Sequence, residues 1–365
     1  MNLDDFLSWF NSTGVNTENV NVSYSITSGF GLYSRRELIE KDFLILSLPE
    51  HLFIKPSFNT NDLTGFEHLI IYLLEEKTNP YIKFLRSIQC IPQWRYYPND
   101  KYPQQLIDKM KKHLNKYNQS RNKILQYNDD EFQWAYYSIN TRCVHFNMEN
   151  DSKDQDDNLC LIPYLDFVNH SIEPNTISKF NSLTRSYEIY SIKTIDFNEQ
   201  ITFLYNPHSN VDLFIEYGFI LSLNPYNQFN IEYNLEQFLS NEQIQIIKSY
   251  NYWNLLEFYS GDNDLSWTII KAIELNINQS QWSPYDDPSS KDKYQLKNKM
   301  KEFLNLIQQN IEKDFQEWIT DHFIVEKNIL YKDFLTTLHD TSIVIDKSII
   351  TTYIYFYQFI TSQIK

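Results

Sequence analysis

Glycine is scarce in this chain, which has 365 residues but only 6 glycines, against a usual share of about 7%. Loops that bind phosphate groups need several glycines close together, because a Cβ atom would keep the ligand away from the backbone. The sequence contains no Walker loop, and its one GxG pair, Gly29-Phe30-Gly31, lacks the third glycine of a dinucleotide-binding fingerprint. The sequence therefore argues against kinases, nucleoside triphosphatases and ordinary Rossmann dehydrogenases.

Cysteine is also rare, and long apolar runs are missing. The 3 cysteines include no CxxC pair, so neither a disulfide framework nor a cysteine-based zinc site is expected. No run of about 18 apolar residues occurs, which predicts no membrane span. The first residues are acidic where a signal or transit peptide would be basic. We therefore expect a soluble protein of the cytoplasm, the nucleus or both.

Basic charge is the third deficit, because 47 acidic residues face only 32 basic ones and the net charge is −15. A nucleic-acid binder needs Lys and Arg to neutralise phosphates, so we expect no direct contact with nucleic acid. A basic protein partner fits better, because opposite electric fields steer encounter. Acidity that only confers solubility is an equal alternative. We also expect a monomer without membrane contact.

Apolar residues are present in ample supply: 42% are hydrophobic and 16% are aromatic, enough for a sizeable core. The spacing of apolar residues predicts an amphipathic helix over residues 3–11 and strands over 22–26 and 43–46. Residues 62–140 have a helical period that several prolines interrupt. Short helices separated by loops are therefore expected there.

The rest of the chain changes from strand-rich to helix-rich near residue 225. An acidic segment at residues 147–158 predicts a mobile loop. Strands are expected over residues 159–162, 187–192 and 200–205. Helices are expected over residues 235–249, 252–260, 265–276, 293–320 and 346–363. The change of pattern marks the predicted domain boundary.

Two short segments carry backbone or basic groups that could bind a ligand. Ser28 precedes the Gly29-Phe30-Gly31 turn between two predicted strands, where glycine would let a ligand approach the backbone. A plain hairpin turn is the alternative. Arg142 ends a helical stretch, where its guanidinium could anchor a carboxylate or a carbonyl group. A helix-end arginine that faces water is the alternative there.

A third segment ends in Asn169-His170, after an apolar run that contains Asp166. Both of these side chains need hydrogen-bond partners if they are buried. They could line a site, or they could cap a buried turn. A metal site built from His170 and Asp166 lacks further ligands at a suitable spacing, so no metal is expected.

A fourth segment contains Tyr205 and continues to Tyr217-Gly218-Phe219. Two phenol hydroxyls beside a pocket can orient an amine, and their rings can contact a cation. Packing in the aromatic core is the alternative for each tyrosine taken alone, since the chain has 27 of them.

In order and spacing these segments resemble the split SET domain of a protein methyltransferase family. That family includes the Rubisco large-subunit lysine methyltransferase, the yeast ribosomal-protein lysine methyltransferases and the actin-histidine methyltransferase. Its Pro-x-x-Asp-x-x-Asn-His motif is similar to residues 163–170, and its Tyr-Gly-Phe is similar to residues 217–219. The chain departs from the family at Ser28, often an acidic residue there, and at Asn198, where a Gly is usual before Glu.

The resemblance implies an α+β fold in which a SET-type β-rich core of short strands has a helical insertion at about residues 62–135. An all-helical C-terminal substrate-binding domain would follow. We expect the SET domain to span residues 1–225 and the helical domain residues 226–365. The implied activity is methyl transfer from S-adenosylmethionine to a lysine amine of a basic protein substrate, with ribosomal or translation-related proteins as candidates.

The family's functional residues carry over position by position. The resemblance implies cofactor contacts from Ser28, Gly29, Phe30, Arg142, Asn169 and His170. It implies that Tyr205 is the catalytic tyrosine, that Tyr217 assists it, and that Asp166, Arg142 and Phe219 contact the substrate.

Two alternatives to a lysine methyltransferase stay open. One is a histidine-directed protein methyltransferase; the histidine-modifying relative has Asn where this chain has Val144 and Ser where it has Tyr217, and both differences favour lysine. The other is a catalytically weak SET-fold module that holds a basic protein partner.

Overall fold

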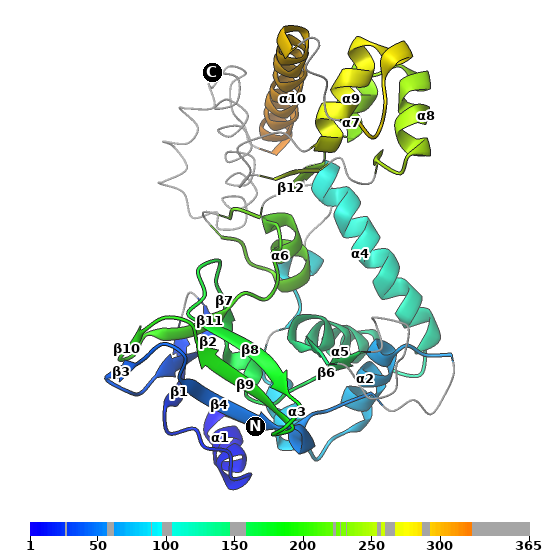
Figure 1. The fold of residues 1–365 in the computed structure, drawn as a ribbon. Helices are drawn as coiled ribbons and strands as arrows, with labels where there is room; N and C mark the ends of the chain where they lie inside the picture. Colours follow the sequence, from blue (N-terminus) through cyan, green and yellow to red (C-terminus); the bar gives the residue numbers. More distant parts are fainter. Residues whose placement is uncertain are drawn as a thin grey trace. The chain divides into compact units, whose positions relative to one another are not determined.

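A computed structural model shows how the elements are arranged (Figure 1). It describes residues 1–25, 28–56, 62–88, 90–96, 104–146, 158–221, 224–226, 228–230, 232–253, 257–259, 267–286 and 293–322. The predicted loop at residues 147–158, apart from Asn158, and the predicted helix at 346–363 lie outside these residues. None of the described helices is long and apolar enough to span a membrane.

The chain divides into two compact units. The first comprises residues 1–97, 109–207 and 215–218, and the second comprises residues 98–108, 208–214 and 219–365. Each unit is described separately below. The domain boundary predicted near residue 225 stays a prediction.

A four-stranded sheet of the first unit brings the distant motifs together. Its strands, in spatial order, are β1 (Val20–Ser25), β2 (Gly29–Ser34), β11 (Gln200–Phe203) and β7 (Asn169–His170). The pairing of β11 with β7 is parallel, with Thr202 opposite Asn169. The glycine turn and the Asn169-His170 pair therefore belong to the same sheet, although they are far apart in the sequence.

A second sheet has the order β4 (Leu44–Pro49), β9 (Ser186–Ser191) and β8 (Thr176–Asn181), all antiparallel. Two small antiparallel pairs complete the strands of this unit: β3 (Leu38–Ile39) with β10 (Ile195–Asp196), and β5 (Val144–His145) with β6 (Leu159–Cys160). The predicted strands near residues 22–26, 43–46, 187–192 and 200–205 are confirmed with shifted ends.

The turn before β11 shows how the chain replaces a family glycine. Asn198 has φ +59°, a left-handed conformation that Asn adopts more readily than most residues. Its N–H donates to the Ser34 carbonyl at 3.0 Å. Asparagine thus supplies the backbone geometry that glycine would otherwise provide.

Helices cover the strands and form the insertion between them. Their bounds are α1 (Leu3–Ser12), α2 (Gly65–Glu75), α3 (Pro80–Leu85), α4 (Gln104–Lys123), α5 (Asp129–Arg142) and α6 (Asn210–Tyr217), with short 3₁₀ turns η1 (Glu50–Leu52), η2 (Gln93–Tyr96) and η5 (Leu165–Phe167). Local signals fix several starts: Thr64 and Glu67 form a capping box before α2, and Pro80 opens α3. The predicted break of this region into separate helices is confirmed at Pro80, which opens α3, whereas α4 is longer than expected, with 20 residues.

Aromatic packing in the first unit holds the turn that carries Asp166. Phe6 of α1 stacks on Phe84 of α3, with ring centroids 4.8 Å apart, and meets Phe167 edge-on at 5.7 Å. All three are almost fully buried, and each such side chain contributes about 2–3 kcal/mol of hydrophobic free energy. Because Phe167 belongs to η5, this packing also fixes the neighbouring Asp166.

The second unit is mainly helical and has its own apolar core. Its helices are α7 (Glu232–Phe238), α8 (Asn241–Ser249), α9 (Trp267–Ile277) and α10 (Lys293–His322), with the 3₁₀ turn η7 (Gln279–Gln281). A single helix over residues 235–249 was predicted, but α7 ends at Phe238 and a second helix, α8, begins after a capping box between Ser240 and Gln243. Local hydrogen bonding by Ser240 therefore breaks the expected helix in two.

A two-stranded antiparallel pair also departs from the predicted all-helical pattern. Strand β12 (Gln228–Asn230) pairs antiparallel with β13 (Glu257–Tyr259), so the predicted helix over residues 252–260 is wrong. Phe258 and Tyr259 are aromatic residues that favour strands when a partner strand is present. That partner lies almost thirty residues upstream, beyond any local helical period.

Candidate active site

A cavity of about 350 Å³ lies within the first unit, where β5, η5 and the end of β11 meet. Four of the predicted site residues line it: Arg142, Asp166, Tyr205 and Tyr217. Val144, His145, Ser178 and Tyr187 extend the lining toward β5, β8 and β9. The fold therefore brings together side chains that are up to 76 positions apart between Thr141 and Tyr217.

Tyr205 and Tyr217 place two phenols side by side in this cavity. Their ring centroids are 5.3 Å apart, and the Tyr205 hydroxyl donates to the Val168 carbonyl at 3.1 Å. Burial raises the pKa of Tyr205 well above its ordinary value and raises the pKa of Tyr217 to about 12. Both phenols are therefore neutral near pH 7 and act as hydrogen-bonding groups.

His170 fixes the start of the segment that carries Tyr205. The backbone N–H of Tyr205 donates to His170 Nδ1 at 3.1 Å, and the two rings lie 5.2 Å apart. Because Nδ1 accepts this bond, the proton of a neutral imidazole resides on Nε2. The Asn169-His170 motif thus sets the position of the tyrosine through the main chain.

Asp166 is a buried carboxylate with two donors on the same oxygen. Its Oδ2 accepts from the Tyr81 hydroxyl at 3.1 Å and from Arg142 Nη1 at 3.2 Å. Only 5% of the Asp166 side chain and 16% of the Arg142 side chain are exposed. Burial raises the pKa of Asp166 above its ordinary value, although the positive charge of Arg142 opposes the shift. The pair places one positive and one negative charge together in the cavity wall.

The glycine turn leaves its backbone open to close approach by a ligand. Gly29 has φ +70°, and nothing lies within 4 Å of the position that a Cβ would take. At Gly31 a Cβ would collide with Gln200 Nε2 and would lie 3.1 Å from Asn169 Nδ2. Asn169 Nδ2 in turn donates to the Phe30 carbonyl at 3.1 Å. A side chain at residue 31 would therefore push the Asn169 amide away from the turn.

The remaining predicted residues lie at the edges of this arrangement. Ser28 is an exposed turn residue directly before β2. Phe219 is half-buried beyond Gly218, and it does not belong to the described lining of the cavity. The roles assigned to all these residues stay predictions.

Sequence reasoning missed Tyr81 as a site residue. Its hydroxyl reaches Asp166 across 85 positions of sequence, and its ring is fully buried. In a chain with 27 tyrosines, nothing local separates such a residue from one that only packs.

The comparisons with known proteins agree with this geometry. The SET domain family matches residues 29–206. SET domain-containing protein 4 of Artemia parthenogenetica is 30% identical over 299 residues, which cover 70% of this chain and 72% of that protein. The chain belongs to the SET-domain family. The resemblance inferred from the four sequence segments is thereby confirmed.

Two further matches place this SET-domain protein among its relatives. Ribosomal lysine N-methyltransferase set11 of Schizosaccharomyces pombe is 34% identical over 167 residues, 45% of this chain and 41% of that protein. The crystal structure of the SET domain of LSMT bound to lysine and AdoHcy superposes with a TM-score of 0.66 at 15% identity, covering 99% of this chain and 89% of that one. This likeness confirms the predicted fold class.

Proposed function

We propose that this SET-domain protein transfers a methyl group from S-adenosylmethionine to the side-chain amine of a lysine in another protein. The observation that carries the proposal is the pair of phenols, Tyr205 and Tyr217, whose ring centroids lie 5.3 Å apart at the cavity of the first unit. The names of two matches support it: set11 is a ribosomal lysine N-methyltransferase, and the LSMT structure is bound to lysine and AdoHcy.

The residues around the glycine turn suit the cofactor. The open space beside Gly29 leaves the backbone accessible, and the buried Gln200 Nε2 has no hydrogen-bond partner among the described residues. Ser28, Gly29, Phe30, Arg142, Asn169 and His170 would hold S-adenosylmethionine. When bound, it supplies a methyl group activated by a positively charged sulfur.

The chain's own residues must deliver a neutral amine in a fixed orientation. An ordinary lysine has a pKa of about 10.4, and a water-poor cavity lowers that pKa because burial disfavours the ammonium form. The Tyr205 oxygen and the Val168 carbonyl are 3.1 Å apart, so both can accept N–H bonds from one amine. Two such bonds fix the direction of the nitrogen lone pair.

Neither tyrosine removes the proton from the lysine. Burial raises the pKa of both phenols, so neither is ionised at pH 7 to act as a base. The proton passes to solvent as the ammonium group loses water, and the narrow cavity then excludes water from the amine.

The pairing of Arg142 with Asp166 keeps the wall of the cavity compatible with a basic substrate. A lone guanidinium would repel the incoming lysine, but Asp166 lies 3.2 Å from Arg142 Nη1 and offsets its charge. The two charges together leave the cavity close to neutral.

Lysine fits the cavity better than histidine does. Val144 lines the cavity with an apolar side chain, which offers no hydrogen bond to an imidazole nitrogen. Tyr217 occupies space that a second ring would need. Lysine is therefore the proposed acceptor.

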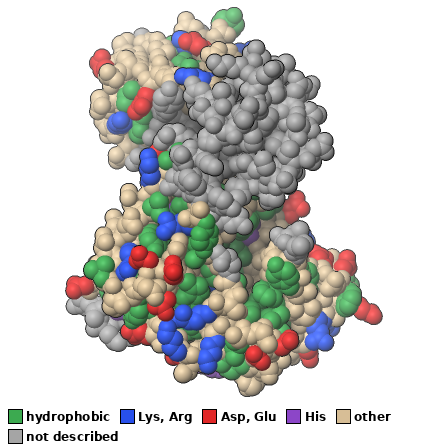
Figure 2. All heavy atoms as spheres, turned by 180° about the vertical axis from the view of Figure 1, so that it is seen from behind, with side chains coloured by type: hydrophobic (Ala, Val, Ile, Leu, Met, Phe, Trp, Pro, Cys, Tyr) green, Lys and Arg blue, Asp and Glu red, His purple; other side chains and the backbone are tan. Residues whose placement is uncertain are grey.

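The proposed substrate is a basic protein, and ribosomal proteins are the first candidates. The net charge of −15 favours such a partner, and the name of the set11 relative points to ribosomes. On the face drawn in Figure 2, acidic side chains lie among hydrophobic ones, as do Lys and Arg side chains. The cytoplasm or the nucleus is the proposed location.

Calorimetric titration with S-adenosylmethionine, followed by transfer of a labelled methyl group to cell extract and to purified ribosomal proteins, tests the proposal. Saturable binding and a labelled lysine, located by mass spectrometry, would support it. A label found on histidine would show that histidine, and not lysine, is the acceptor. No cofactor binding at millimolar concentration would leave the binding-module alternative.

A further inference from the structure

A polar cluster holds the last turn of α6, directly before Tyr217; the Glu216 side chain at its centre is 35% exposed. His113 Nδ1 lies 3.3 Å from Glu216 Oε1, and Asn140 Nδ2 donates to Glu216 Oε2 at 2.6 Å. The His113 side chain is only 4% exposed. Side chains from two helices, His113 of α4 and Asn140 of α5, thus hold one carboxylate at the end of α6.

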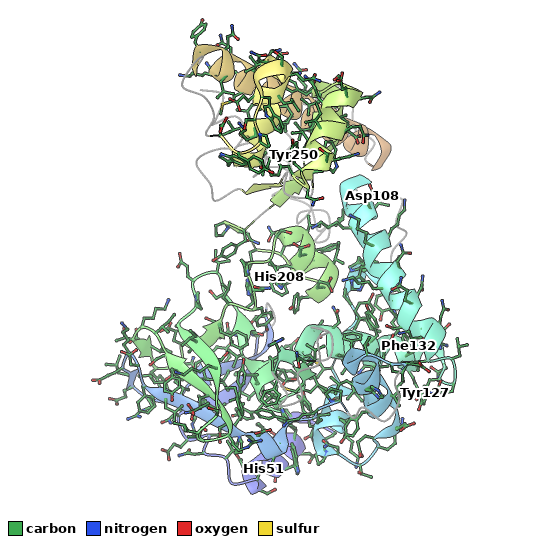
Figure 3. All side chains as sticks on the ribbon, turned by 45° about the vertical axis from the view of Figure 1, so that its right-hand side comes forward. His51, Asp108, Tyr127, Phe132, His208 and Tyr250 are labelled. Carbon is green, nitrogen blue, oxygen red and sulfur yellow. The ribbon has the colours of Figure 1, made fainter. Side chains whose placement is uncertain are left out.

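A third segment fixes the backbone of the same turn. Trp94 of η2 donates from Nε1 to the Ile215 carbonyl at 3.0 Å, and it is almost fully buried. The His113 ring stacks on Tyr137 with ring centroids 5.6 Å apart and meets Trp94 edge-on at 5.8 Å. Helix α4, on which Figure 3 labels Asp108, carries His113 further along its length.

Glu216 carries the negative charge that strengthens the hydrogen bonds of this cluster. Burial alone would raise the pKa of Glu216, but the hydrogen bonds from His113 and Asn140 outweigh it, and the pKa lies below its ordinary value. Glu216 is therefore an anionic acceptor at neutral pH, and hydrogen bonds to charged groups are the stronger ones.

The cluster connects to both sides of the cavity. Tyr217 follows Glu216 directly in the chain, and its ring faces Tyr205. Asn140 precedes Arg142 by two positions on α5, so one helix end carries both the group that holds Glu216 and the group that pairs with Asp166.

We infer that Glu216, held by His113 and Asn140, is a positioning residue that fixes the Tyr217 phenol opposite Tyr205. Its meaning for catalysis rests on the proposed methyltransferase function, whereas the placement of Tyr217 does not. Glu216 acts on the position of Tyr217 through the backbone that these neighbours share, and its negative charge also contributes to the raised pKa of the Tyr217 phenol.

Steady-state kinetics with a saturating lysine substrate provide the first test. Glu216→Ala should lower kcat by about 100-fold, because small misplacements of positioned groups cost that much, while the Kd for S-adenosylmethionine stays within about twofold. Glu216→Gln should recover most of kcat, since an amide can accept from Asn140 and donate to His113 Nδ1. Glu67→Gln, at a buried carboxylate of the same unit, is the control and should keep the wild-type kcat.

A second variant covers the case in which Glu216→Ala does not fold. Asn140→Asp places a second carboxylate where the amide now lies 2.6 Å from Glu216, and like charges at that distance repel. It should lower kcat in the same direction as Glu216→Ala. An unchanged kcat per folded molecule with a lower Tm, in either variant, would show a purely structural role and overturn the inference.

A measurement without turnover separates this inference from the proposed function. With 3-fluorotyrosine placed only at position 217, the ¹⁹F signal should shift or broaden in Glu216→Ala and Asn140→Asp, should change less in Glu216→Gln, and should stay unchanged in Glu67→Gln. If the wild-type protein transfers no methyl group, the proposed function fails, yet this signal still reports whether Glu216 places Tyr217. An unchanged signal in both Glu216→Ala and Asn140→Asp would overturn the inference whatever the kinetics show.

Discussion

The two units differ in how their buried polar groups find partners. In the first unit, Asp166 accepts from Tyr81 across 85 positions, and Asn169 donates to Phe30 across 139. In the second, buried Lys271 pairs with Glu274 three positions away, and buried Gln243 donates to the Leu275 carbonyl across 32 positions. These polar contacts of the first unit join more distant parts of the chain than those of the second, and the contact at Asp166 lies at the cavity, so the chemistry there depends on tertiary structure.

The apolar cores of the two units also differ, in the kind of side chain that they bury. The first unit packs aromatic rings such as Phe6, Phe84 and Phe167 against one another, which gives fixed orientations to the turns they belong to. The second unit buries mainly aliphatic side chains, among them Ile247 and Ile273. A site that needs exact placement is supported by the stiffer packing, and variants in the two units should separate activity from stability.

The largest effect is expected from Tyr205→Phe. Removing the hydroxyl that bonds to the Val168 carbonyl should lower the rate of methyl transfer about 100-fold or more, with little change in cofactor Kd. Single-turnover kinetics would measure it. Tyr164→Phe, at another buried tyrosine of the same unit, is the control and should keep the wild-type rate; equal rates in both variants would contradict the role of Tyr205.

A large loss of stability is expected from Asp166→Asn. The Arg142 guanidinium would be left buried without its counter-charge, which costs about 3–5 kcal/mol of unfolding free energy. Asp129 pairs with Arg121 while its side chain is 84% exposed, so Asp129→Asn should cost only about 0–1 kcal/mol. Urea unfolding of both variants would measure the difference, and similar costs would refute the contrast between buried and exposed pairs.

Gly31→Ala should weaken cofactor binding without changing the binding of the lysine substrate. A Cβ at this position collides with Gln200 Nε2 and crowds Asn169 Nδ2, so the Asn169 amide must move from the turn. Cofactor affinity should fall about tenfold, equivalent to one lost hydrogen bond, while the KM for the lysine substrate stays unchanged. Calorimetry and initial rates would show it; an unaltered cofactor Kd would mean that the turn does not hold the cofactor.

Ser240→Ala tests a local contact of the second unit. Ser240 accepts from the Gln243 N–H and caps α8, so its loss should cost about 1 kcal/mol of unfolding free energy. Ser240→Asp should restore most of that stability, because aspartate also caps helices. Thermal unfolding measures both, and kcat per folded molecule should be wild-type in each. A loss of kcat would show that the second unit controls the chemistry directly.

The smallest effect concerns pH and Glu216. Because its folded-state pKa is lowered, its ionised form stabilises the folded protein above the ordinary pKa of about 4.3, and this stability is lost as pH falls through the lower folded value. The difference in unfolding free energy between wild type and Glu216→Gln should therefore shrink as the pH is lowered from 6 toward 3. Asp166, whose pKa is raised, should have the opposite dependence. A difference that grows on acidification would contradict the assignment.

Much of the fold could be predicted because its signals are local. Proline at the start of α3 and alternating residues in β9 can be recognised within a few positions. The helix over 252–260 was wrong because the strand partner of β13 lies far upstream. The break at Ser240 has a local signal, a serine followed three residues later by glutamine, that the apolar period obscures.

The candidate site was predictable in its segments and not in its contacts. The spacing of residues 163–170 and of Tyr217 marked the family, and four of the predicted residues line one cavity. Tyr81 and Glu216 have no comparable signal, because their partners are 85 and 103 positions away. Only the three-dimensional structure shows that Tyr81 bonds to Asp166 and that Glu216 bonds to His113.

The parallel pairing of β11 with β7 also has a consequence for the order of folding. Between these strands the chain makes the β8–β9 hairpin, which belongs to the other sheet. A hairpin closes a short loop, whereas β7 and β11 must meet across about thirty residues, a slower closure that gains from a hairpin already formed. We expect the region around Tyr205 to be among the last parts to acquire its native contacts during refolding, so that a newly made chain gains its shape before its catalytic competence.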